Sequence, residues 1–263
     1  MTWITLQCLA LGGLAGFLAG LLGIGGGLLM VPFFAWILPA SGMNPALIMQ
    51  VAVGTSLSVI AFTSLSSALA HHRREGVLWP VFRLLVPGLV LGALAGSAIA
   101  DVIPSDWLQR IVGVAALLVA IKMMLNLQPP AHHVVPGGVG LFSAGGVIGA
   151  VSALIGIGGG SLTVPYLNWC NVEMRRAVGT AAASGIPIAW AGALGFIWTG
   201  MNETGLPPHS LGYVYLPALL ATGIASICLA PLGARAAHAL PAAALKKVFA
   251  VLLLVIGIRM LIA

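Results

Sequence analysis

A glycine-rich stretch that occurs twice constrains the fold of this chain more than any other feature. Residues 23–36 read GIGGGLLMVPFFAW and residues 156–169 read GIGGGSLTVPYLNW, so nine of fourteen positions are identical without a gap. Glycine loses the most backbone freedom on ordering, so three adjacent glycines in an apolar run weaken any helix. The repetition therefore predicts two equivalent helix breaks that the fold requires.

The composition places these breaks inside a membrane. The chain is 60% hydrophobic and only 6% charged, and its mean hydropathy is +1.11. Several unbroken apolar runs exceed the roughly 20 residues with which a helix crosses a bilayer. The net charge of +6 comes from basic residues in short loops. In that position they orient helices in a membrane, and no nucleic-acid partner is expected.

The apolar sequence divides into ten segments. Five are expected in the first half, at residues 3–22, 28–39, 46–70, 77–100 and 106–126. Five more are expected in the second half, at residues 137–155, 161–170, 176–199, 211–235 and 243–262. The second segment of each half is too short to cross a bilayer unaided. Each glycine motif is therefore expected to lie in a broken or re-entrant hairpin.

The similarity between the halves extends beyond the glycine motifs. Ala52-Val53-Gly54-Thr55 returns as Ala177-Val178-Gly179-Thr180, and Ile121-Lys122-Met123 returns as Ile258-Arg259-Met260. Such repetition predicts a tandem duplication. The expected organisation is a first transmembrane repeat at 1–126, a linker at 127–136 and a second transmembrane repeat at 137–263.

The positions of the basic residues predict how the two repeats are oriented. Threading the segments so that basic loops are cytoplasmic puts nine Lys and Arg on that side and only Arg110 and Arg259 on the other. The two repeats then have opposite orientations, and both termini are periplasmic. The predicted fold class is an all-α polytopic membrane protein with two inverted-topology repeats of about five segments, each with a Gly-rich helix break. This architecture is common in secondary transporters.

A helix that begins directly after each glycine motif predicts an anion site. The first backbone N–H groups of a helix have no intrahelical partner, and its N-terminus carries about half a positive charge. Glycines allow a ligand to approach these groups closely. Ser161 and Thr163 add hydroxyls in the second copy, where the first has Leu28 and Met30. The alternative interpretation is that the glycines only allow helices to cross closely.

Hydroxyl residues near the repeated Gly-Thr pair are further candidates. Thr55, Ser56 and Thr180 are able to donate to an anion, or to bond a carbonyl one turn back in their own helix. The predicted substrate-binding residues are Gly25, Gly26, Gly27, Thr55, Ser56, Gly158, Gly159, Gly160, Ser161 and Thr180.

The sequence indicates no catalysis. All five acidic residues lie at segment ends, so none is expected to carry a proton through the membrane centre. The three cysteines, Cys8, Cys170 and Cys228, lack metal-ligand or redox spacing and are expected to pack in the core. No metal, no cofactor and no enzymatic activity are therefore expected.

The paired motifs resemble a known family. Gly-x-Gly-Gly-Gly with Val-Pro downstream in two copies, Ala52-Val53-Gly54-Thr55-Ser56 with its echo at 177–180, and Leu232-Gly233-Ala234-Arg235 are similar to the TauE/SafE sulfite exporter family of membrane permeases. The resemblance implies transport of sulfur-containing anions such as sulfite, thiosulfate or organosulfonates across the bacterial inner membrane. The second copy departs from the first at Ala181, which replaces Ser56.

The sequence thus predicts an inner-membrane secondary transporter of a small sulfur-containing anion that works by alternating access. The alternatives are a passive anion channel, a transporter of a carboxylate anion and a membrane-embedded scaffold subunit. The expected partners are the anionic substrate, the lipid bilayer and, through self-association, a second copy of the chain.

Overall fold

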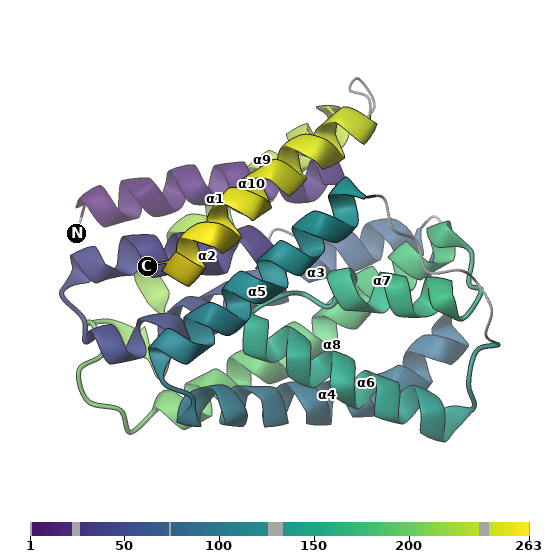
Figure 1. The fold of residues 1–263 in the computed structure, drawn as a ribbon, viewed down its shortest axis with the longest axis horizontal. Helices are drawn as coiled ribbons and strands as arrows, with labels where there is room; N and C mark the ends of the chain where they lie inside the picture. Colours follow the sequence, from purple (N-terminus) through teal and green to yellow (C-terminus); the bar gives the residue numbers. More distant parts are fainter. Residues whose placement is uncertain (1, 23–26, 74, 126–133, 237–241, 263) are drawn as a thin grey trace.

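The structure, a computed structural model, describes residues 2–22, 27–73, 75–125, 134–236 and 242–262 (Figure 1). The helices of the first half are α1 (Thr2–Leu22), α2 (Gly27–Ile37), α3 (Ile48–His72), α4 (Trp79–Val102) and α5 (Ser105–Met124). Those of the second half are α6 (Gly138–Ile155), α7 (Gly160–Trp169), α8 (Met174–Gly200), α9 (Leu216–Ala236) and α10 (Ala242–Ile262). Short 3-10 turns, η1 (Leu38–Ser41) and η2 (Pro45–Leu47), join α2 to α3.

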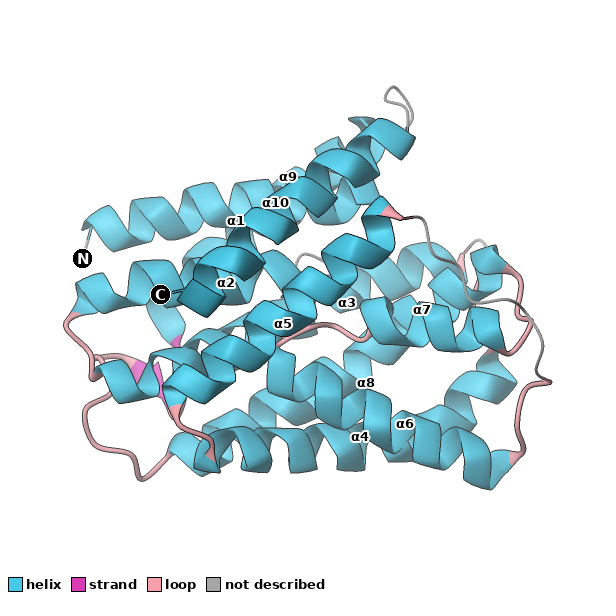
Figure 2. Ribbon diagram, in the orientation of Figure 1, coloured by secondary structure: helices cyan, strands magenta, loops and turns pink. Residues whose placement is uncertain are grey.

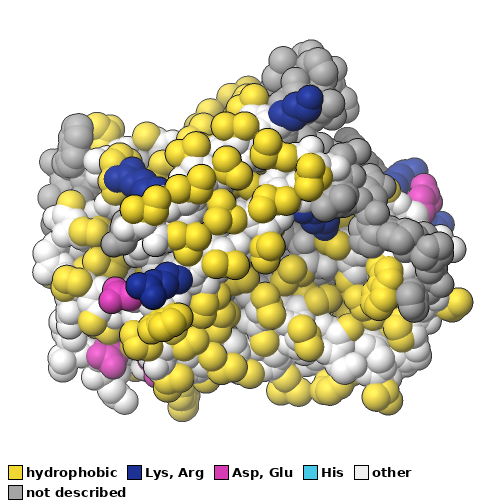
Figure 3. Space-filling model, viewed as in Figure 1, with side chains coloured by type: hydrophobic (Ala, Val, Ile, Leu, Met, Phe, Trp, Pro, Cys, Tyr) yellow, Lys and Arg dark blue, Asp and Glu magenta, His cyan; other side chains and the backbone are white. Residues whose placement is uncertain are grey.

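The molecule is an all-α polytopic membrane protein. Within the described residues, five helices are long and apolar enough to cross a membrane: α3, α4, α5, α6 and α8. Figure 3 shows a broad hydrophobic surface whose acidic side chains lie only toward its two ends. Hydrocarbon around the bundle would be in contact with this apolar surface, and the charged ends would lie in the headgroup regions.

The helices after the glycine motifs are short. Helix α2 has 11 residues and α7 has 10, too few to span a bilayer. Figure 1 shows α7 turning back toward the end of the bundle where α6 begins. The α6–α7 pair is therefore a hairpin whose glycine loop lies inside the bundle, as predicted from the length of the apolar segments.

One segment begins later than the sequence predicts. Helix α9 starts at Leu216, whereas the apolar segment was expected from residue 211. The intervening residues form an antiparallel hairpin of β1 (Ser210–Leu211) and β2 (Val214–Tyr215), which Figure 2 shows at the same end of the bundle as the N-terminus. Val214 and Tyr215 belong to the apolar segment expected from the sequence, but they form a strand and not the start of the helix.

Helices of the first half pack mainly on helices of the second half. The most extensive contacts join α4 to α6 and α1 to α9, so the first helix of each half packs on the fourth helix of the other. Helices α3 and α8 pack on each other, as do α5 and α10. Figure 1 shows α4 and α6 side by side below the centre and α1 and α9 above it. Neither half is a separate unit.

Glycines mark these exchanged contacts at positions related by the sequence repeat. Gly12 of α1 lies directly against the backbone of Thr222 in α9, and Gly145 of α6 lies against the backbone of Leu85 in α4. Gly12 and Gly145 differ by 133, the offset between the two glycine motifs, and Leu85 and Thr222 differ by 137, the offset of the fourth and fifth segments. The same contact thus occurs twice with the halves exchanged, which supports the interpretation as a tandem duplication.

The cysteines are only partly as expected. Cys8 and Cys170 are buried, but Cys228 on α9 is exposed. The expectation of three core thiols is therefore wrong for Cys228, because an apolar helix in this bundle has an outward face as apolar as its packed face.

Candidate functional site

Gly27, the described end of the first glycine run, lies next to the second glycine motif. A Cβ atom added to Gly27, at the start of α2, would lie 3.0 Å from the carbonyl oxygen of Gly156 and 3.4 Å from Cα of Ile157. Gly25 and Gly26, two of the predicted site residues, lie outside the described residues. At Gly27, then, backbone from one half directly approaches backbone from the other.

The loop between α6 and α7 depends on two glycines with positive φ. Gly156 ends α6 at φ 76°, and Gly159 precedes the first turn of α7 at φ 66°. Residues with a side chain rarely adopt this left-handed conformation, so glycine at both positions lets the chain reverse within four residues. The reversal brings Gly158, Gly159 and Gly160, all predicted site residues, to the N-terminus of α7.

This N-terminus carries unused hydrogen-bond donors. No side chain caps α7, and the Ser161 amide forms no backbone hydrogen bond with the described residues. The hydroxyls of Ser161 and Thr163 are buried and have no partner within the described part of the chain, and Thr163 is fully buried. Buried polar groups are normally paired, so unpaired hydroxyls beside a helix N-terminus indicate a site for an acceptor that comes from outside the protein.

Ile60 lies between Gly27 and the second glycine loop. It is the middle residue of the 25-residue α3. Its side chain fills the position that a Cβ atom of Gly27 would take, and it lies 2.7 Å from a Cβ added to Gly158. Sequence reasoning did not select Ile60. The sequence does contain a hint. When the halves are aligned with the offset of 125 that relates Thr55 to Thr180, Ile60 aligns with Gly185, so the two halves differ at this position.

Ser56 connects the first half to the second glycine loop. Its Oγ donates a hydrogen bond of 3.1 Å to the carbonyl oxygen of Gly156. Ala181 takes the corresponding position in the second half and has no hydroxyl, so the connection has no equivalent there. Ser56 therefore lies beside the loop, and its hydroxyl proton is already donated to the Gly156 carbonyl oxygen.

Thr55 and Thr180 are both fully buried and bonded to backbone from the opposite half. The Oγ1 atom of Thr55 accepts from the Tyr215 amide at 3.0 Å, and that of Thr180 accepts from the Leu78 amide at 2.9 Å. Each hydroxyl proton is still available to donate. These two threonines flank the glycine loops and are not brought into direct contact with each other.

Charge at the site comes from backbone and not from side chains. All five acidic residues are described, and they lie in loops or in the terminal turns of helices. Among the described residues, the second glycine loop and the first turn of α7 (156–163) combine the helix dipole, a free N–H and hydroxyl groups without a titrating side chain. Such a set of donors binds a small oxyanion and provides no nucleophile or general base.

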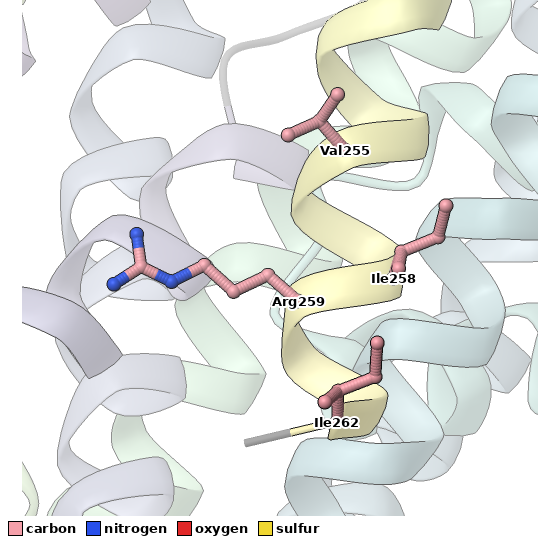
Figure 4. Close-up of a pocket in the computed structure, with 4 residues that line it drawn as sticks. All are labelled: Val255, Ile258, Arg259 and Ile262. Atoms are coloured by element: carbon pink, nitrogen blue, oxygen red, sulfur yellow. The ribbon is translucent and has the colours of Figure 1, made fainter.

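An open surface depression of about 460 Å³ lies on α10, apart from the glycine loop between α6 and α7. It is lined by Val255, Ile258, Arg259 and Ile262 (Figure 4). The Arg259 guanidinium lies 5.3 Å from the centre of the exposed Trp36 ring. An arginine stacked on an exposed tryptophan at the end of an apolar helix is typical of a membrane interface.

These features define a class of protein. A polytopic helical bundle in which the start of α2 meets the glycine loop between α6 and α7 has the architecture of a membrane transporter. The chain belongs to the sulfite exporter TauE/SafE family, whose profile matches residues 8–260.

Similar proteins carry the same general description. A probable membrane transporter protein of Haemophilus influenzae is 36% identical over 258 residues, covering 97% of both chains. One of Methanocaldococcus jannaschii is 29% identical and covers 95% of this chain and 93% of its own. No solved structure matches the chain significantly. The family and these relatives establish a membrane transporter.

Proposed function

We propose that this protein carries a small sulfur-containing oxyanion, such as sulfite, thiosulfate or an organosulfonate, across the bacterial inner membrane by alternating access. The observation that carries the proposal is the pair of buried, unpartnered hydroxyls of Ser161 and Thr163 at the uncapped N-terminus of α7. Sulfur oxyanions supply the several acceptor oxygens that such donors lack.

The proposed binding residues surround the point where the glycine motifs meet. They are Gly25, Gly26, Gly27, Thr55, Ser56, Gly158, Gly159, Gly160 and Thr180, together with Ser161 and Thr163. The remaining free protons on the Thr55 and Thr180 hydroxyls point to a role beside the anion. Both termini are proposed to be periplasmic, and the chain is proposed to be a transporter without enzymatic activity.

Thr163→Val tests the site. The change removes the hydroxyl with little change in volume, so binding of the preferred anion should weaken about tenfold, the effect of one hydrogen bond to a charged group. Without ligand, the free energy of unfolding should stay within about 0.5 kcal/mol of the parent value, because the lost hydroxyl has no protein partner. Binding is measured by ligand-induced thermal stabilisation against sulfite, sulfate, thiosulfate, taurine and acetate.

Matched variants separate the site from general effects. Thr163→Ser keeps the hydroxyl and should retain binding. Ser97→Ala removes a fully buried hydroxyl that donates to Leu94 within α4, and should leave anion binding unchanged. Equal stabilisation by all five anions, or by acetate alone, would contradict the proposed substrate class.

The mode of transport needs a separate measurement. In proteoliposomes, alternating access predicts that internal unlabelled anion accelerates uptake of labelled anion, because loaded carriers exchange faster than empty ones return. A passive channel shows no such acceleration. Saturation of flux with substrate at fixed voltage provides a second distinction.

A further inference from the structure

The Gly-Thr pair of the Ala-Val-Gly-Thr motif in each half packs against and hydrogen-bonds to the backbone of the opposite half. In α3, a Cβ added to Gly54 would lie 2.7 Å from the carbonyl oxygen of Tyr213, and Thr55 accepts the amide of Tyr215 at 3.0 Å. Glycine thus lets an extended strand lie against the helix, and threonine bonds the same strand two residues later. We call the contacts of Gly54 and Thr55 with Tyr213 and Tyr215 the hairpin junction.

An equivalent contact forms in the other half. In α8, Gly179 lies directly against the carbonyl group of Gly76, and Thr180 accepts the amide of Leu78 at 2.9 Å. We call this set the loop junction. Its helix positions follow those of the hairpin junction by 125, and Gly76 and Leu78 precede Tyr213 and Tyr215 by 137. The two junctions are therefore copies of one contact in which the two halves have exchanged roles.

The junctions lie toward opposite ends of the bundle. Thr55 and Thr180 are both in the second turn or the start of the third turn of their helices, and α3 and α8 begin at opposite ends (Figure 1). Tyr215 directly precedes α9, and Leu78 directly precedes α4. The glycine loops and Ile60 lie between the two junctions, at the middle of α3.

Both junctions are closed in this structure. Thr55, Thr180 and Thr163 have no exposed surface. The hydroxyl oxygens of Ser161 and Thr163 at the start of α7 are also buried, although Gly160 and Ser161 keep part of their surface exposed. An anion can reach these hydroxyls only after the surrounding contacts open.

We propose that the hairpin junction and the loop junction are the two gates of the transport cycle, which open in turn on opposite sides of the membrane. The inference rests on the proposed alternating access. Opening one gate breaks one threonine–amide hydrogen bond and one glycine–backbone contact, while its copy holds the opposite end closed. Because the threonine and glycine contacts are equivalent, these contacts alone favour neither the outward-open nor the inward-open state.

The hairpin gate carries an additional latch. The Tyr213 hydroxyl donates a 2.8 Å hydrogen bond to Oδ1 of Asp101, at the end of α4. Burial and the neighbouring Asp101 raise the pKa of Tyr213, so the hydroxyl remains protonated and the bond persists across the physiological pH range. Gly76 takes the corresponding position in the loop gate and has no side chain. The hairpin gate therefore opens less readily than the loop gate.

A reporter cysteine in place of Ile60 tests the two gates separately. The native cysteines Cys8, Cys170 and Cys228 are first replaced by alanine. A membrane-impermeant maleimide is then applied to one side of oriented vesicles. Thr55→Val should raise the labelling rate about fivefold from the hairpin side only, as loss of one hydrogen bond predicts. Thr180→Val should raise it by a similar factor from the loop side only.

Further variants keep the test decisive if a valine variant fails to fold. Tyr213→Phe removes only the latch hydroxyl and should raise labelling from the hairpin side. Thr55→Ser and Thr180→Ser retain the acceptor and should match the parent. Gln109→Leu is the control, because the Gln109 side-chain amide donates to the Met260 carbonyl oxygen between α5 and α10, and neither helix belongs to a junction. It should change labelling from neither side.

Two results would contradict the proposal that the junctions are gates: labelling that rises equally from both sides, or labelling that is unchanged in Thr55→Val, Thr180→Val and Tyr213→Phe. Either result would make the junctions static packing contacts. The readout requires no substrate. A failure of the proposed anion specificity therefore leaves the sided labelling intact, and a failure of the gates leaves the anion-binding result intact.

Discussion

At the scale of single residues, Ile60 determines how much room the glycine loops leave between them. Its branched side chain lies against Gly27 and Gly158 and is only 4% exposed. The corresponding residue of the other half is Gly185, whose added Cβ would lie 3.0 Å from the Gly158 carbonyl oxygen. The centre is therefore lined by a bulky residue from one half and bare backbone from the other.

Ile60→Ala should enlarge this central space. The expected cost is about 2–5 kcal/mol of unfolding free energy, as for other buried isoleucine truncations. Binding of a bulky organosulfonate should improve relative to sulfite, measured by competition. Leu253→Ala, at a fully buried position on α10, should cost similar stability without changing relative affinities. The same change in both variants would assign the effect to general loosening of the bundle.

At the scale of elements, the α4–α6 contact relies on backbone approaching backbone. Gly88, Gly92 and Gly96 recur every four residues on α4, and an added Cβ at each would collide with the backbone of α6. This glycine stripe is therefore a packing surface. Close backbone approach is how helices associate in a membrane, where no hydrophobic effect drives them together.

Gly92→Ala should therefore destabilise the protein by about 1–3 kcal/mol, because the added methyl group has no room and forces the helices apart. Gly223→Ala on α9 is the matched control, since nothing lies within 4 Å of its added Cβ. It should stabilise by about 0.5–1 kcal/mol through helix propensity. Unfolding in mixed micelles measures both. A neutral Gly92→Ala would show that α4 and α6 adjust freely.

At the scale of the whole molecule, the arrangement of ends predicts topology. The N and C labels lie at one end of the bundle in Figure 1. Exposed Glu75 and Glu203 lie in loops that follow α3 and α8, which run in opposite directions. In a cysteine-free background, Glu75→Cys should label only from the cytoplasm and Glu203→Cys only from the periplasm. Labelling of both from one side would exclude inverted repeats.

The distribution of charge predicts how binding responds to pH. Because the glycine loops carry no carboxylate, anion affinity should change little between about pH 6 and 8 beyond the ionisation of the anion itself. His71 and His72 lie at the end of α3. The affinity is measured in the parent and in a His71→Ala/His72→Ala variant. A steep dependence that survives the double change would reveal a titrating group at the site.

The sequence alone determined the membrane class, the ten segments, the duplication and the two helix breaks. These properties depend on composition, on segment length and on glycine within apolar runs, all of which are local. The adjacency of the glycine motifs at Gly27 and Gly156 also follows from the duplicated pattern, because binding sites of repeated transporters form where the repeats meet.

Only the tertiary structure decided what the hydroxyls do. The sequence predicts that Thr55 and Thr180 donate either to an anion or to a carbonyl in their own helix. The structure shows each also accepting an amide from the opposite half, 160 and 102 residues away. Whether a hydroxyl is paired depends on which backbone the exchanged helices bring beside it, and residue type does not encode that. The same holds for the unpaired Thr163 and for Ile60, whose roles arise from neighbours supplied by both halves.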